Sequence, residues 1–165
     1  MAPYDIRLFG DPVLKTPASE ITNIDGTLAA LAKDMLTTMY EAPGIGLAGP
    51  QVGVQKRIFV YDIGDGTGPH TVINPVLTKP DGVWTYEEGC LSVPGLYWPI
   101  ERAATVHLTG LDLDGNDLDI EADELLARMF QHEVDHLDGM LLLERLTNEQ
   151  RKDAMRELRR RQEGQ

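Results

Sequence analysis

Three stretches of the chain carry the hydrophobic and polar pattern of a helix. Apolar residues recur at steps of three and four over residues 28–39, which predicts a helix with one buried face that ends before a Pro-Gly pair. A second helix is predicted for residues 123–137, because Asp123 suits an N-cap and Gly139 suits the left-handed residue after a helix. A third is expected over residues 147–161, where the first four residues form a capping-box sequence.

Strand patterns fill most of the chain between the first and second predicted helices. Short runs there are rich in β-branched and aromatic residues or alternate between apolar and polar positions. They cover residues 57–63, 71–73, 83–87, 96–102, 105–111 and 117–120. The last two are expected to form a hairpin through the Asp114-Gly115-Asn116 turn. The pattern predicts a single α+β domain over residues 1–165, with mostly antiparallel strands packed around a central metal-binding helix and with an N-terminal and a C-terminal helix.

The composition is that of an ordinary folded domain. Hydrophobic residues make up 42% of the chain and charged residues 25%. A stretch of about 18 consecutive apolar residues is missing, so no membrane span is expected, and the N-terminus does not resemble a secretory signal peptide. Cys90 is the only cysteine. A lone thiol fits a reducing compartment, so the cytoplasm is the expected location.

The formal net charge is −12, but the charge is unevenly distributed. Residues 151–165 hold six basic side chains against three acidic ones, whereas the rest of the chain is acidic. An acidic surface repels nucleic acid, so no specific DNA binding is expected. The basic C-terminal segment fits two interpretations: a solvated helix whose cations suit its own dipole, or a helix that docks on an anionic partner such as a ribosome.

The clearest chemistry lies in His132, Glu133 and His136 of the second predicted helix. Residues four apart lie on one face of a helix, so both imidazoles can reach the same metal ion. Glu133 starts the next turn and can stand close to a water molecule bound there. Two histidines at this spacing also occur as ordinary polar residues, but the glutamate between them favours a metal site. This His-Glu-x-x-His pattern is typical of metal-dependent hydrolases.

A catalytic metal of this kind needs a third protein ligand, which these residues leave open. A third histidine six residues after His136 would indicate a metzincin protease, but Leu142 occupies that position. A downstream glutamate would indicate a thermolysin-like protease, and Glu157 is the candidate well inside a predicted helix. Cys90 is the other candidate, because thiolate is a strong ligand for borderline and soft divalent metals. Its neighbour Gly89 permits close backbone approach.

A glycine-rich segment covers residues 44–53. It lacks the Gly-Lys-Ser/Thr of a phosphate loop and the third glycine of a dinucleotide fingerprint. One interpretation is a tight connection between a helix and a strand. The other uses the absent side chains: an extended substrate would lie against Gly44 and Gly46, while the amide of Gln51 would donate to a developing oxyanion.

Three segments, in this order, resemble the motifs of the peptide deformylase family. They are Gly-Ile-Gly-Leu-Ala-Gly-Pro-Gln at 44–51, Glu-Gly-Cys-Leu-Ser at 88–92 and Gln-His-Glu-Val-Asp-His-Leu-Asp-Gly at 131–139. The resemblance covers nearly the whole chain, and the long C-terminal helix is similar to the type 1 branch found in many bacteria. Gly49 departs from the family pattern, which usually has a second alanine there. The missing methyl is expected to loosen the strand by up to about 1 kcal/mol without affecting activity.

The resemblance implies a catalytic role for individual residues. The metal ligands that it implies are Cys90, His132 and His136. Glu133 would act as general base and acid, and Gln51 with the backbone N–H of Leu91 would form an oxyanion hole.

The resemblance also implies a set of substrate-binding residues. They are Gly44, Ile45, Gly46, Glu88, Gly89, Leu125 and Met129. Ile45, Gly46 and Gly89 would pair with the substrate backbone as a β-strand does. Glu88 and Arg102 also resemble structural supports in the family.

The pocket for the first substrate side chain is expected to be apolar. Leu125 and Met129 would line it from the second helix. Arg128, at its margin, is expected to bury only its aliphatic stem and to send its charged head to solvent. Arg102 is expected to pair with Asp135.

The reaction that the resemblance implies is removal of the N-formyl group from new polypeptides that begin with formylmethionine, with release of formate. The implied cofactor is one divalent metal ion: Fe²⁺ is usual in the family, and Zn²⁺, Ni²⁺ or Co²⁺ also suit two imidazoles and a thiolate. The residues alone leave two alternatives, a thermolysin-like zinc metalloprotease with Glu157 as third ligand and a non-catalytic domain with a metal staple. Glu133 and Gln51 argue against the staple, because neither is needed to hold a metal.

Overall fold

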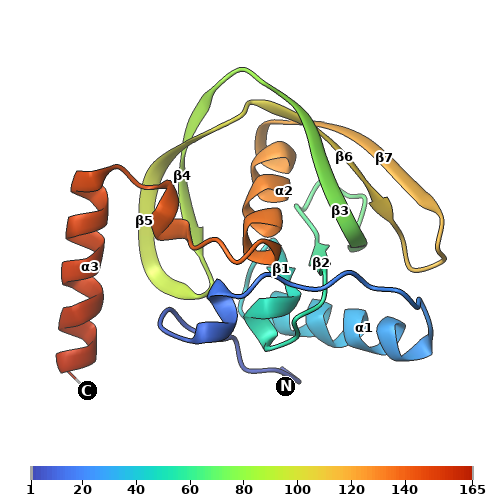
Figure 1. Cartoon of the computed structure of the whole chain (residues 1–165), viewed down its shortest axis with the longest axis horizontal. Coiled ribbons are helices and arrows are strands. Elements are labelled where there is room, and N and C mark those ends of the chain that lie inside the picture. The colour runs from blue at the N-terminus through green and yellow to red at the C-terminus, as the bar shows by residue number, and fades with distance from the viewer. Residues whose placement is uncertain (1, 165) are drawn as a thin grey trace.

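Figure 1 shows the arrangement of residues 2–164, which the computed structural model describes. The helices are α1 (Gly26–Glu41), α2 (Glu124–Leu137) and α3 (Asn148–Glu163), with the short 3-10 helices η1 (Pro12–Lys15), η2 (Gly49–Val52) and η3 (Leu142–Arg145). The strands are β1 (Gly46–Ala48), β2 (Ile58–Tyr61), β3 (His70–Asp81), β4 (Trp84–Cys90), β5 (Val93–Arg102), β6 (Thr105–Leu111) and β7 (Asp117–Asp123). The predicted α+β fold class is confirmed.

The strands form two antiparallel sheets. Five strands pair in the order β1-β2-β3-β6-β7, and β4 pairs with β5 in a separate two-stranded sheet. The register places Val60 opposite Thr71 in the large sheet and Glu88 opposite Trp98 in the small one. Within the described residues, β1 and β4 each pair with one strand only, so each keeps an open edge.

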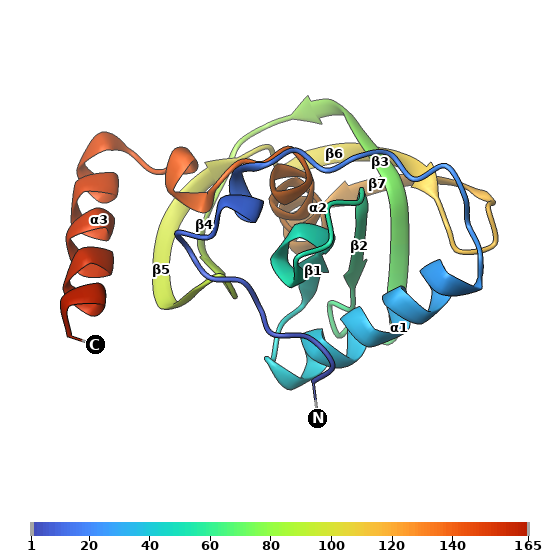
Figure 2. The same ribbon diagram turned by 60° about the horizontal axis from the view of Figure 1, so that its bottom comes forward.

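Helix α2 lies at the centre of the molecule, between the two sheets (Figures 1 and 2). It packs against β1, β3, β6 and β7 of the large sheet. Its side chains Met129, Phe130 and Leu137 are buried in one cluster with Phe59 and Val72 of that sheet. Because burial of this apolar face holds the helix in place, the polar residues of α2 have defined positions too.

Both ends of α2 agree with the prediction. Asp123 occupies the N-cap position, although its side chain makes no capping hydrogen bond. Gly139 has a positive φ of 75°. A Cβ on Gly139 would lie 2.7 Å from the carbonyl oxygen of Lys15, so the glycine also lets the N-terminal segment pass the end of the helix.

Helix α1 covers the β1–β2 edge of the large sheet (Figure 2). The side chain of Asp25 caps it by accepting a hydrogen bond from the backbone N–H of Leu28. Its buried residues are Leu28, Ala32, Met35, Thr38 and Met39. The predicted amphipathic helix is therefore confirmed.

Strand β3 is longer than predicted, because two prolines interrupt its pattern. The prediction covered residues 71–73, whereas the strand continues through Pro75 and Pro80. Its pairing with β6 shifts register at both prolines. Asn74 and Lys79, which precede them, have positive φ values of 52° and 51°. These irregularities accommodate residues that cannot donate a ladder hydrogen bond.

The expectation that Gly49 loosens a strand is wrong. Gly49 begins the η2 turn instead of continuing β1. A Cβ there would lie 2.7 Å from the carbonyl oxygen of Val54 and 2.8 Å from that of Lys56, so a methyl has no space. The glycine therefore permits close packing of the turn that carries Gln51, which is 1% exposed.

Helix α3 lies at one end of the molecule, beside the small sheet (Figure 1). Thr147 and Gln150 form the predicted capping box at its start. Only a narrow apolar stripe packs inward: Ala154 is buried and Leu158 is partly buried, in a cluster that includes Ile100. Gln150 and Arg161 also donate to the carbonyl oxygens of Pro99 and Pro94 of β5, and most other side chains of the helix are exposed.

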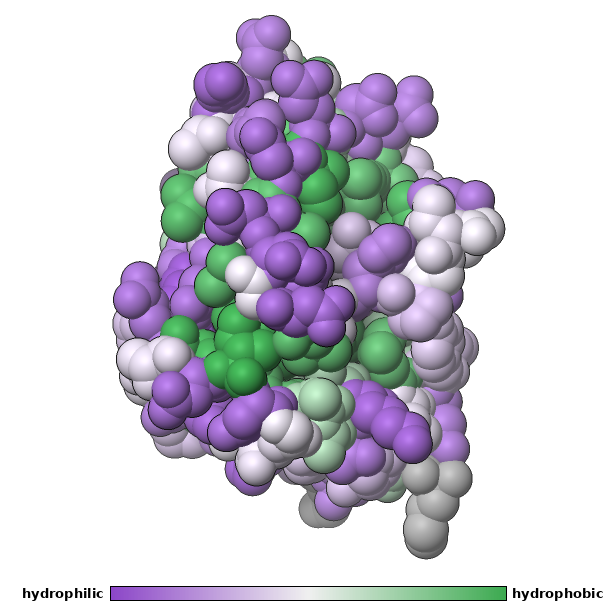
Figure 3. Space-filling view, turned by 90° about the vertical axis from the view of Figure 1, so that its right-hand side faces the viewer, coloured by the Kyte–Doolittle hydropathy of each residue, from purple (hydrophilic) through white to green (hydrophobic). Residues whose placement is uncertain are grey.

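The end of the molecule away from α3 presents a mixed surface (Figure 3). Apolar areas there are separated by polar and charged side chains, as is ordinary for a domain surface. None of the helices in residues 2–164 combines the length and apolar character that crossing a bilayer requires.

Candidate metal centre and substrate cleft

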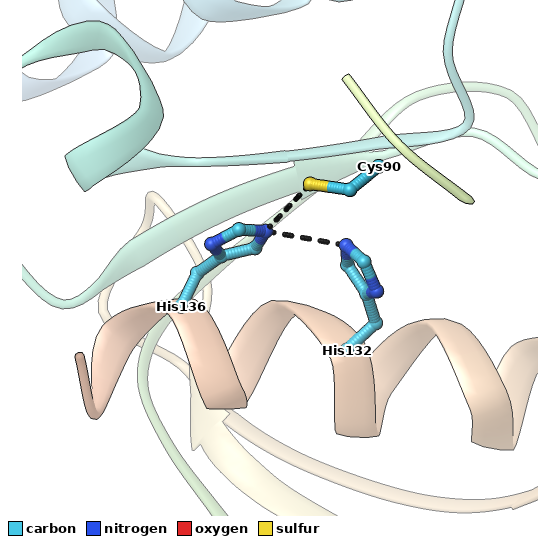
Figure 4. A group of neighbouring side chains, drawn as sticks. All are labelled: Cys90, His132 and His136. Carbon is cyan, nitrogen blue, oxygen red and sulfur yellow. Dashed lines mark hydrogen bonds between the residues drawn. The ribbon is translucent and has the colours of Figure 1, made fainter. Parts of the chain in front are cut away.

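Cys90 at the end of β4 and two histidines of α2 direct their ligand atoms toward one another (Figure 4). Cys90 Sγ lies 3.3 Å from His136 Nε2, which lies 3.2 Å from His132 Nε2. All three atoms fall within 4.8 Å of one another. One sulfur and two imidazole nitrogens at this spacing suit a tetrahedral divalent ion that keeps a fourth position open. These side chains, which we call the donor group, therefore fit the metal expected from the sequence.

Glu157, the other candidate for third ligand, lies outside the donor group. It is on α3, where its carboxylate pairs with Arg160 and Arg161. The fold brings β4 to α2 but carries α3 to the end of the molecule (Figure 1). The thermolysin-like interpretation is therefore wrong.

Glu88 fixes the orientation of the His132 ring. His132 Nδ1 lies 2.8 Å from Glu88 Oε2. A carboxylate only accepts hydrogen bonds, so Nδ1 carries the hydrogen and Nε2 keeps its lone pair for a metal. Burial opposes ionisation of Glu88, but the hydrogen bonds from His132 and Arg102 outweigh burial and hold the Glu88 pKa well below its usual range.

Arg102 connects Glu88 to Asp135, which follows His132 by three residues on α2. Its Nε and Nη2 donate to Glu88 at 2.8 and 2.7 Å, and its Nη1 donates to Asp135 at 2.9 Å. The predicted Arg102–Asp135 pair is confirmed. Asp135 also pairs with Arg145, which sequence reasoning missed because no local pattern marks it.

The expectation for Arg128 is wrong. The residue is 3% exposed, and its guanidinium donates to Glu88 instead of reaching solvent. The expectation failed because the neutralising carboxylate comes from a strand far away in the sequence. With both oxygens of Glu88 occupied by arginines and His132, Glu88 supports the donor group and has no acceptor left for substrate.

Glu133 lies beside the donor group in a nearly closed environment. It is 3% exposed, and its Oε1 has no hydrogen-bond partner among the described residues. Burial is the main influence on the pKa of Glu133 and raises it above its usual value. An unpaired carboxylate oxygen with a raised pKa is suited to take a proton from water.

The amide of Gln51 is held at both ends. Its Oε1 accepts from the backbone N–H of Ala48 at 3.0 Å, and this contact turns Nε2 toward the donor group. Nε2 lies 3.6 Å from Cys90 Sγ and 3.2 Å from Ser92 Oγ. Ser92 is a site residue that sequence reasoning did not use, although it belongs to the Glu-Gly-Cys-Leu-Ser motif.

A cavity of about 740 Å³ opens next to the donor group, between the edge strands β1 and β4. All the residues expected to bind substrate line it, together with Cys90 and His132. Leu8 and Tyr97, which are 53% and 64% exposed, also line this cleft. The sequence did not predict these two, because only the tertiary fold brings the N-terminal segment and β5 to the cleft.

A donor group with the buried carboxylate of Glu133 beside it is the arrangement of a metal-dependent hydrolase, which places a carboxylate next to an open metal position. Comparison with known proteins identifies the family within this class of hydrolases. The sequence model of polypeptide deformylases matches residues 3–152, and the chain belongs to that family.

Individual relatives agree with this assignment. A peptide deformylase of Acidothermus cellulolyticus is 50% identical over 159 residues, which cover 96% of this chain and 87% of that protein. One of Clostridium botulinum is 50% identical over 147 residues, which cover 89% of this chain and 99% of that protein. The structure of a Synechococcus elongatus peptide deformylase in complex with actinonin matches with a TM-score of 0.91 at 40% identity, over 95% of this chain and 88% of that chain.

Proposed function

We propose that the protein removes the N-formyl group from new polypeptides that begin with formylmethionine and releases formate. The observation that carries the proposal is the unpaired, buried carboxylate oxygen of Glu133 beside the donor group, in a cleft that is open to an extended chain. Membership of the polypeptide deformylase family supports the same reaction.

The donor group would hold one divalent ion, Fe²⁺ in the cell, and would also accept Zn²⁺, Ni²⁺ or Co²⁺. Such an ion lowers the pKa of a bound water molecule and polarises the formyl oxygen. Glu133 would take the water proton and later deliver it to the leaving amine. Gln51 Nε2 and the backbone N–H of Leu91 would donate to the oxyanion that develops from the formyl oxygen.

The substrate would lie as an added strand between the open edges of β1 and β4. Ile45 and Gly46 on one side and Gly89 on the other would supply backbone groups to it. Leu125 and Met129, which line the cleft from α2, would contact the first side chain. Their apolar character suits methionine.

Formate release from formyl-Met-Ala tests the proposal. We expect the metal-loaded full chain to release formate and to leave acetyl-Met-Ala almost unchanged, because the cleft must admit the acyl group beside Glu133. The acetyl peptide is a matched control, since it differs by one methyl group. If a chain that holds one metal ion releases no formate, the metal is a structural staple.

Gly46→Ala is expected to disable Glu133. A Cβ on Gly46 would lie 2.5 Å from Glu133 Oε2, so the carboxylate must move. Misplacement of a catalytic group by about 1 Å can cost about 100-fold, and we expect kcat for formate release to fall by about that factor. Gly26→Ala is the control, because a Cβ there meets nothing within 4 Å. Unchanged kcat in Gly46→Ala would contradict the placement of Glu133.

We also propose that α3 docks on the ribosome, which places the reaction in the cytoplasm where new chains emerge. The side of α3 that faces away from the buried Ala154 carries exposed basic residues. They include Lys152, Arg156 and Arg159, which surround the partly exposed Met155. A cationic surface on an otherwise acidic protein suits the phosphates of ribosomal RNA.

Reversing these charges tests the docking. The triple change Lys152→Glu, Arg156→Glu and Arg159→Glu is expected to weaken co-sedimentation with ribosomes by about 10-fold or more at low salt. Hydrolysis of a short formyl peptide should stay the same, because none of the three substituted residues lines the cleft.

The control is the same charge change elsewhere on the surface, at Lys15, Lys33 and Lys79. Equal losses of ribosome binding in both triple variants would mean that net charge, and not α3, accounts for the effect.

A further inference from the structure

Arg128 is a cation buried between α2 and the small sheet. Only 3% of the residue is exposed. Its guanidinium carbon lies 5.2 Å from the ring centre of Trp84 and 5.8 Å from that of Tyr86, both on β4. A buried charge is costly unless it is paired and hydrogen-bonded. The partners of Arg128 therefore indicate its role.

Three acceptors hold the guanidinium. Nη1 donates to Glu88 Oε1 at 2.8 Å. Nη2 donates to the carbonyl oxygen of Ile100 at 2.9 Å and to that of Trp84. Arg128 therefore ties α2 to both strands of the small sheet, and Glu88 supplies the negative charge that neutralises it.

The Glu88 carboxylate accepts four hydrogen bonds. Its Oε1 accepts from Arg102 Nε and Arg128 Nη1. Its Oε2 accepts from Arg102 Nη2 and His132 Nδ1. A carboxylate has about four acceptor positions, so all of them are filled. The group cannot turn without losing one of these bonds, and its contact with His132 depends on both arginines.

We propose that Arg128 is a positioning residue that acts through Glu88 to hold His132 in its metal-binding orientation. The inference rests on the proposed function of the donor group as a metal site. Without Arg128, Oε1 keeps one donor, the Nε of Arg102, and the carboxylate is held less firmly against His132 Nδ1. Nδ1 then loses the acceptor that selects its tautomer, and the Nε2 lone pair is no longer directed at the ion. Arg102 keeps both of its bonds to Glu88, but it belongs to β5, whereas Arg128 belongs to α2 and fixes Glu88 against the helix that carries His132.

Metal affinity in a double-mutant cycle tests this role. The dissociation constant for Zn²⁺ is measured by competition with a chromophoric chelator, for the full chain, Arg128→Met, Glu88→Gln and the double variant. We expect Arg128→Met to weaken Zn²⁺ binding by about 10-fold or more. In the Glu88→Gln background, Arg128→Met should weaken Zn²⁺ binding little further, because the effects of two residues that act through one contact do not add.

Two further variants separate positioning from folding. Arg128→Lys keeps a donor for Glu88 but loses the planar fork, so it should recover part of the lost affinity. Arg57→Met is the matched control. Arg57 also fixes the end of α2, because it donates to the carbonyl oxygen of Leu137 and to the carboxylate of Asp138, but it does not contact Glu88. It should leave Zn²⁺ affinity unchanged.

The possible failures are distinguishable. If the losses of Zn²⁺ affinity in Arg128→Met and Glu88→Gln add in full in the double variant, the proposed role of Arg128 is wrong. A lower Tm with unchanged Zn²⁺ affinity in both Arg128→Met and Arg128→Lys would also overturn it. Failure of the unsubstituted chain to bind Zn²⁺ would instead overturn the proposed metal site itself.

Discussion

Glu133→Gln is expected to lower kcat for formate release by about 10²–10⁴-fold. Glutamine keeps the size of the side chain but cannot take a proton from water. The carboxylate is well placed for that step, because it is 3% exposed and its Oε1 has no partner within residues 2–164. The metal content should stay at the level of the unsubstituted chain, since Glu133 lies outside the donor group.

Steady-state kinetics with formyl-Met-Ala and elemental analysis check both expectations. Glu124→Gln, at the exposed start of α2, is the matched control and should keep full activity. A Glu133→Gln protein that remains active would remove this carboxylate from the proposed reaction. One that has lost its metal would make Glu133 a ligand instead.

Cys90→Ser is expected to lose the metal and, with it, all formate release. Two imidazoles are fewer than the three protein ligands that such an ion needs. Burial alone would raise the pKa of Cys90, but the imidazoles of His136 and His132 outweigh burial and hold that pKa well below its usual value. The sulfur is therefore available as a thiolate, whereas a serine hydroxyl stays protonated and binds weakly.

Glu157→Gln is the matched comparison for the third ligand. It should keep full metal content and activity, because the Glu157 carboxylate pairs with Arg160 and Arg161 on α3. Elemental analysis after dialysis measures both variants. Metal retained in Cys90→Ser but lost in Glu157→Gln would contradict the donor group described above.

The histidine pair could be predicted from the sequence because its geometry is local. His132 and His136 belong to one helix, and helical periodicity alone places them on one face. The order of the three long helices and of strands β2 to β7 was predictable for the same reason, whereas β1 lies in the glycine-rich segment and was not among the predicted strands. The third donor was not, because only the tertiary fold decides whether β4 or α3 approaches α2, and the family resemblance was needed to favour Cys90 over Glu157.

The features that sequence reasoning missed depend on contacts between distant segments. Burial of Arg128 requires Glu88, a residue of another element, to face it. Gly49 needs neighbouring carbonyl groups to exclude a methyl, and they belong to the chain after the η2 turn. Strand β3 continues through Pro75 and Pro80 because its pairing with β6 tolerates register shifts there. Local propensity contains none of this information.

A crystal structure of the zinc-loaded chain is the most direct test of the donor group. One ion should be bound by Cys90 Sγ at about 2.3 Å and by the Nε2 atoms of His132 and His136 at about 2.0–2.1 Å. Its fourth position should face Glu133 and Gln51 and hold solvent or formate. An ion bound elsewhere, or one closed off by a fourth protein ligand, would contradict the proposed enzyme.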